Sequence, residues 1–109
     1  MKKIVLTAAA LFLLTGFSSA SDEAKREPNQ LFYKGNSFYE KRDYAKAVES
    51  YLAASDLGVM SGHLYYNTGN GFFKLEKIGY AILYYEKAKR IMPGDSDLKS
   101  NLDFAKSMV

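Results

Sequence analysis

The sequence predicts an all-α protein in which helical hairpins stack into a short solenoid. The main observation is an internal repeat, because residues 31–54 match residues 65–88 at a constant offset of 34 positions. A fixed period of this length is typical of stacked helix–turn–helix units, each of which cannot bury its apolar face alone. Both small and large residues recur at this offset. The matching pairs are Gly35 with Gly69, Phe38 with Phe72, Ala47 with Ala81, Tyr51 with Tyr85, and Ala54 with Ala88.

Helix boundaries follow from caps and chain breakers. Asp43, Ser61 and Asp95 are good N-cap residues. Gly58 suits the position just after a helix, and Pro93 ends one. Helices are therefore expected over residues 28–41, 44–57, 62–75, 77–91 and 96–109.

The last of these helices is expected to be a cap. Its apolar residues form one stripe at helical period, which would cover the open side of the second hairpin. End repeats of solenoids need such a cap, because their outer face would otherwise meet water. The stripe consists of Leu98, Leu102, Ala105 and Val109.

The repeat resembles the tetratricopeptide repeat (TPR), whose pattern is Leu-Gly-x-x-Tyr, then Ala-x-x-x-Phe, then Pro. Lys34 and Thr68 stand where Leu is usual, and Val59 stands where Pro93 closes the second copy. The resemblance implies two hairpins, residues 28–61 and 62–95, followed by a capping helix over 96–109. Together they would form a short right-handed α-solenoid.

The first twenty residues have the layout of a secretory signal peptide. A Lys-Lys start precedes an apolar run over residues 4–14, and small residues lead to a cleavage site after Ala20. An apolar run this short does not cross a bilayer of about 30 Å as a helix, although an uncleaved membrane anchor is the alternative. Residues 1–20 are therefore expected to be a leader that directs export to the periplasm or cell envelope. Charged residues 21–27 are expected to be a mobile tail.

Composition argues against catalysis and against nucleic-acid binding. The chain has no cysteine and one histidine, His63, so neither a metal site nor a nucleophile–base pair is expected. The net charge of +3 includes two leader lysines, and no basic cluster is expected on one face. The sequence predicts no enzyme, no cofactor and no nucleic-acid partner.

Aromatic residues beyond those needed for packing indicate a binding groove. In proteins with this repeat, the first helix of each hairpin lines a concave groove that contacts a peptide, so the resemblance implies a protein or peptide partner. Inter-repeat packing, with the asparagines bonding only across helices, is the alternative. The expected groove residues are Phe32, Asn36, Tyr39, Tyr66, Asn67, Asn70, Phe73 and Asn101.

A narrower resemblance concerns residues 65–70, 79–88 and 101–105, which are similar to the TPR region of BatE-type proteins of the Bacteroides aerotolerance group. Those are cell-envelope proteins, so the resemblance implies a scaffold that binds a partner there. Two alternatives stay open. The chain could be a structural subunit that self-associates as a homo-oligomer, or an accessory domain of an envelope complex. Contact with the membrane is expected only through a partner or an uncleaved leader.

Overall fold

The computed structural model describes residues 27–109, which form five helices and no strand. The predicted leader, and all but the last residue of the predicted tail, lie outside the described residues. The predicted all-α solenoid is confirmed. The helices are the first helix (residues 27–40), α2 (Tyr44–Asp56), α3 (Gly62–Lys74), α4 (Ile78–Ile91) and α5 (Ser96–Ser107).

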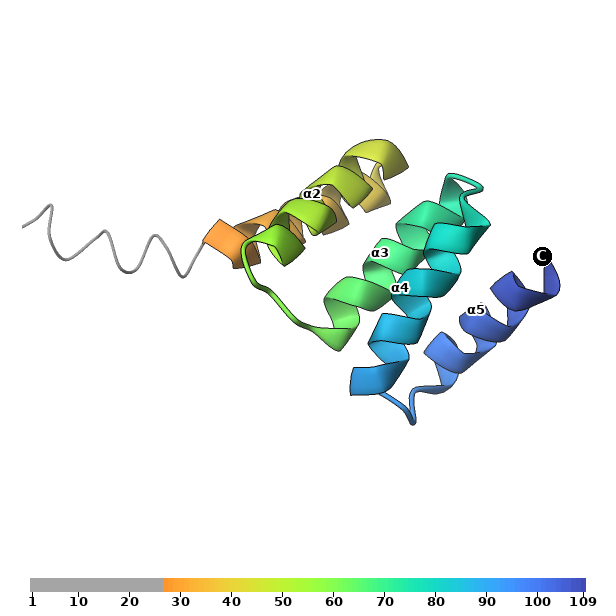
Figure 1. Cartoon of the computed structure of the whole chain (residues 1–109). Helices are drawn as coiled ribbons and strands as arrows, with labels where there is room; N and C mark the ends of the chain where they lie inside the picture. The colour runs from red at the N-terminus through yellow and green to blue at the C-terminus, as the bar shows by residue number, and fades with distance from the viewer. Residues whose placement is uncertain (1–26) are drawn as a thin grey trace, which may run out of the picture.

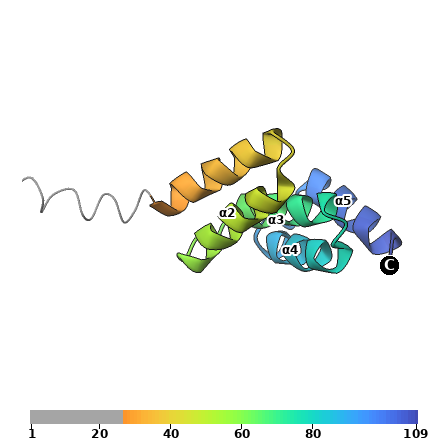
Figure 2. The ribbon, with the colours of Figure 1, turned by 90° about the horizontal axis from the view of Figure 1, so that it is seen from above.

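The helices follow one another in space as they do along the chain (Figure 1). Each of α2, α3 and α4 packs against the helix that follows it. The first helix lies beside α2, at the end of the stack opposite α5 (Figure 2). This order is that of a solenoid, in which each unit contacts only its neighbours.

The three predicted N-caps are confirmed. Asp43, Ser61 and Asp95 each accept a hydrogen bond from a backbone N–H three residues on, which satisfies a donor that the helix itself leaves unpaired. The turns also repeat, because Arg42 and Glu76, 34 positions apart, both have a φ of 62°. No glycine marks these left-handed turns in the sequence.

A tyrosine ring fills the space beside each mid-helix glycine. A Cβ built on Gly35 would lie 2.4 Å from the Tyr51 ring, and one built on Gly69 would lie 2.6 Å from the Tyr85 ring. Both rings are almost fully buried, at 1% exposure. Ring atoms of the partner helix, and not its alanines, are the nearest neighbours at both positions. The absent side chain therefore makes room for an aromatic ring.

Helix α5 takes the place that the first helix of a third hairpin would occupy. Leu98, Leu102 and Ala105 are buried against the preceding hairpin, as the predicted stripe requires. Val109 is 83% exposed and does not join the stripe, because the helix ends at Ser107.

The outer face of α5 carries charged residues at repeat positions where the second hairpin has small or apolar residues. Asp103 stands at the repeat position of Gly69, and its carboxylate pairs with Lys99 at 3.0 Å. Lys106 stands at the position of Phe72 and pairs with Glu86 of α4 at 2.7 Å. A carboxylate at the glycine position cannot receive a tyrosine ring, so this face is suited to water, as a cap requires.

Candidate functional site

Two adjoining hollows lie on the face formed by the first helix, α3 and α5. Their volumes are about 370 Å³ and about 200 Å³, and Tyr39 and Asn70 line both. We call this surface the groove. The remaining lining residues are Asn36, Glu40, Tyr51, Asn67, Phe73, Lys74, Tyr85, Asn101 and Phe104.

Six of the eight groove residues expected from the sequence line these hollows, and two do not. Phe32 and Tyr66, which stand at the same repeat position, are half-buried against the tyrosines of the partner helices. The ring centroids of Phe32 and Tyr51 are 6.0 Å apart, as are those of Tyr66 and Tyr85. Phe32 and Tyr66 therefore pack within their own hairpins, whereas the alternative left open from the sequence was packing between neighbouring repeats.

A hydrogen-bond network connects the helices beneath the groove. Tyr51 Oη donates to Asn36 Oδ1 at 2.6 Å, and Asn67 Nδ2 donates to the same oxygen at 3.1 Å. One repeat further on, Tyr85 Oη and Asn101 Nδ2 donate to Asn70 Oδ1 at 2.5 and 3.1 Å. The network therefore joins the first helix to α3, and α3 to α5.

Asn101 extends the network by a further contact. Its Nδ2 atom also donates to the Tyr66 hydroxyl, at 2.9 Å. Tyr66 therefore supports the groove from its edge without lining either hollow.

These bonds occupy only one end of each amide. Among the described residues, the Nδ2 groups of Asn36 and Asn70 donate to no other group, and Asn67 and Asn101 accept nothing through Oδ1. An amide carries two donors and an acceptor oxygen with two lone pairs. The asparagines are thus held in place across helices and still present unpaired donors and acceptors along the groove.

Burial keeps the two tyrosine hydroxyls protonated. Removal from water, with smaller contributions from Tyr39 and Glu40, raises the pKa of Tyr51 to about 12. Burial also raises the pKa of Tyr85, helped by Tyr66 and Tyr39. Both hydroxyls therefore remain hydrogen-bond donors to Asn36 and Asn70 at higher pH than a tyrosine exposed to water would.

Sequence reasoning missed several residues of the groove. It did not include Tyr51 and Tyr85, although each of them lines one of the hollows. It also missed Phe104, whose ring centroid is 5.7 Å from that of Phe73. The register could have found Phe104, because it lies 34 positions after Asn70. Glu40 and Lys74 carry no such signal.

Other kinds of site find little support in the described part of the chain. Residues 27–109 contain no group of three side chains able to hold a metal ion. His63 is exposed near the start of α3. Within the same residues, no helix has the length and apolar character needed to cross a membrane.

Comparison with known proteins agrees with the repeat. No protein-family model matches the chain. The sequence is similar to a DnaJ homolog subfamily C member 7 homolog of Schizosaccharomyces pombe, with 32% identity over an alignment of 85 residues. That protein comes from a family whose members contain tetratricopeptide repeats. The helical repeats of this chain are tetratricopeptide-like.

The extent of this similarity is limited. The alignment covers 72% of this chain but only 18% of the length of the yeast relative. The similarity therefore concerns the repeats and not the whole relative. Resemblance to BatE-type proteins, and export of the chain, stay predictions from the sequence.

Proposed function

We propose that this protein is an interaction module that binds an extended segment of a partner protein in the groove. The observation that carries the proposal is that each asparagine side chain forms hydrogen bonds through only one end of its amide group. Asn36 and Asn70 keep donors, and Asn67 and Asn101 keep acceptors, at a spacing of one repeat. A peptide backbone offers complementary groups at every residue.

The aromatic residues of the groove suit the same ligand. Tyr39 and Phe73 are half-buried, so each is anchored by packing and still presents part of its ring. Such rings supply contact area at little entropic cost, because they have only two side-chain torsions. Similarity to a tetratricopeptide-repeat relative also favours a protein partner and a scaffold over a catalyst.

We place this function in the periplasm or cell envelope. Residues 1–20 support export by their charged start, apolar run and small residues before Ser21. The BatE-type resemblance of the repeats supports the same compartment. The partner would then be an envelope protein with an exposed extended segment.

A peptide library displayed on phage would test the groove. Peptides selected on the full-length protein are measured by fluorescence anisotropy against wild type and Tyr39→Ala. We expect Tyr39→Ala to weaken binding at least about tenfold, because truncating a central aromatic anchor at a hot spot typically costs about 2 kcal/mol or more. Tyr33→Ala is the matched control, since Tyr33 is 68% exposed and lies outside the groove.

The comparison separates groove binding from loss of fold. Thermal melting followed by circular dichroism must show both variants folded at the temperature of the binding experiment. Equal affinities of the two variants for the selected peptides would refute groove binding. A self-associating subunit would instead show a mass that rises with concentration and no preference among peptides.

A further inference from the structure

A third hollow, separate from the two that form the groove, lies between the first helix and α2. Its volume is about 360 Å³, and its apolar part is formed by Leu31, Phe38 and Ala53. None of its lining residues lines the groove. We call this surface the end face, because the first helix and α2 form the end of the stack opposite α5 (Figures 1 and 2).

The internal repeat shows what covers the equivalent surface one unit later. Shifting Leu31 and Phe38 by 34 positions leads to Tyr65 and Phe72 of α3. There Val48 of α2 is buried in one cluster with Phe72, and Leu52 and Tyr65 pack against the cluster. An α-helix with two aliphatic side chains four residues apart therefore covers this surface in the second hairpin.

A glycine of α3 lies directly against α2 in that covered interface. A Cβ built on Gly71 would lie 2.6 Å from Cγ2 of Val48. At the same repeat position of the first hairpin stands Ser37, which is small and exposed. The end face thus keeps room for an aliphatic side chain at the position where Val48 lies in the second hairpin.

Burial differs between the two surfaces in the same register. Thr68 is fully buried at 0% exposure, whereas Lys34, at the same repeat position, is exposed. Phe72 is 8% exposed, whereas Phe38 is only half-buried. The end face presents to solvent the type of apolar surface that the second hairpin buries under α2.

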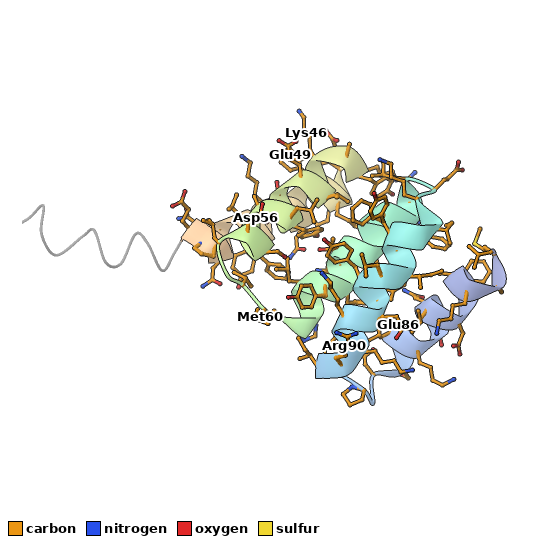
Figure 3. All side chains as sticks on the ribbon, viewed as in Figure 1. Lys46, Glu49, Asp56, Met60, Glu86 and Arg90 are labelled. Atoms are coloured by element: carbon orange, nitrogen blue, oxygen red, sulfur yellow. The ribbon has the colours of Figure 1, made fainter. Side chains whose placement is uncertain are left out.

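Lysines border the end face. The ammonium groups of Lys34 and Lys46 lie 5.9 and 5.7 Å from the Phe38 ring centroid. Glu49 is the acidic residue among those that line the hollow, and Figure 3 shows it beside Lys46, both projecting outward from α2. Lys46 also pairs with Asp43, at 3.9 Å between Nζ and Oδ2, so Lys34 supplies the further positive charge that favours an occupant with an acidic residue at its edge.

We propose that the end face binds an amphipathic α-helix of a partner protein. The helix presents two aliphatic side chains four residues apart, as Val48 and Leu52 of α2 do one unit later, and an acidic residue toward Lys34 and Lys46. The axis of the bound helix runs across the first helix in the direction in which α2 runs across α3. This contact adds a helix to the end of the solenoid, and it is independent of a segment bound in the groove.

The probe for this site is a synthetic peptide with the sequence of α2, residues 44–56, capped at both ends. An isolated helix of this length is marginal in water, so part of the binding energy is used to order it. We expect saturable binding to the full-length protein below about 1 mM, measured by fluorescence anisotropy. The same peptide with Val48→Asp and Leu52→Asp should not bind, because its aliphatic stripe is lost.

Variants of the protein locate the peptide. Ser37→Arg places a long charged side chain where the valine of the peptide should lie, so affinity should fall at least about tenfold. Ser37→Gly, which copies Gly71, should bind at least as well as wild type. Ser100→Arg on the exposed face of α5 is the matched control and should not change the affinity. Because Ser37 and Ser100 are both exposed, the two arginine variants should melt close to wild type, whereas Ser37→Gly should melt slightly lower because glycine is the poorer helix former.

Several results would overturn the proposal. One is no saturable binding up to the concentration stated above. Another is equal affinity of Ser37→Arg and Ser100→Arg, or a loss in Tyr39→Ala, which would place the peptide in the groove. The last is a dimer in sedimentation that the peptide dissociates, which would show that a second copy of this chain occupies the end face.

Discussion

Gly69 shows how one missing methyl group determines the packing of a hairpin. A Cβ at this position would lie 2.6 Å from the buried Tyr85 ring, so the ring or the helix must move when one is added. We expect Gly69→Ala to lower the free energy of unfolding by about 1–3 kcal/mol through overpacking, even though alanine is the better helix former. Urea unfolding followed by circular dichroism measures the change.

Gly79→Ala is the matched control for this substitution. Gly79 lies in α4, and a Cβ built there meets nothing within 4 Å. The same chemical change should therefore be neutral or should stabilise the protein by up to about 1 kcal/mol. If both variants unfold at the same urea concentration, the glycine–tyrosine packing is wrong.

At the residue scale, the sequence identified the positions that are constrained by packing. It predicted less well which residues contact them. The offset of 34 marked Gly35 and Gly69 as packing positions. It matched Tyr51 with Tyr85 but could not give the rotation of one helix against another, which is set by tertiary packing and places these two rings against the glycines. For the same reason it left open whether Asn36 and Asn70 face the groove or bond across helices, and they do both.

Among the four helices α2–α5, α4 is the one that begins without a side-chain cap. Lys77 occupies the N-cap position and makes no hydrogen bond with its side chain, whereas Asp43 at the same repeat position caps α2. We expect Lys77→Asp to raise the free energy of unfolding by about 0.5–2 kcal/mol, since a carboxylate accepts from the exposed backbone N–H groups and favours the positive end of the helix dipole. Urea unfolding measures the gain.

Lys74→Asp is a control with the same change of net charge. Lys74 lies in the last turn of α3, where a carboxylate meets the negative end of the helix dipole. This variant should be no more stable than wild type. An equal gain in both variants would mean that net charge, and not capping, is responsible.

Most helix ends could be read from the sequence because they depend on local chemistry. Asp43, Ser61 and Asp95 cap as expected, and Gly58 adopts a φ of 95° after α2. The left-handed turns at Arg42 and Glu76 could not be foreseen, because neither residue type favours that conformation. The three-residue connection before each second helix, residues 41–43 and 75–77, is a property of the hairpin and not of one residue.

Across the five helices of residues 27–109, the stack is better supported at its C-terminal side than at its N-terminal side. The larger core cluster includes eight buried residues drawn from α2, α3, α4 and α5. The smaller cluster has four, and the first helix packs on it with Leu31, Phe32 and Phe38. One end is closed by the charged face of α5, whereas the end face of the first hairpin presents apolar surface.

This asymmetry should appear in native-state hydrogen exchange. Solenoids open unit by unit, and segments with fewer buried contacts open at lower free energy. We expect the backbone amides of the first helix to exchange at least about tenfold faster than those of the central turns of α3 and α4, as measured by mass spectrometry of peptide fragments.

Leu102→Ala supplies the internal comparison for this experiment. Leu102 is 2% exposed and belongs to the larger cluster, so its truncation should cost about 2–5 kcal/mol. Because the effect passes between neighbouring units, exchange in α4 and α5 should accelerate more than exchange in the first helix, which is already fast. Uniform exchange along the chain in wild type, with a uniform increase in the variant, would show one cooperative unit. The first hairpin would then be as stable against local opening as the second. The difference in local stability inferred from the two core clusters would be wrong.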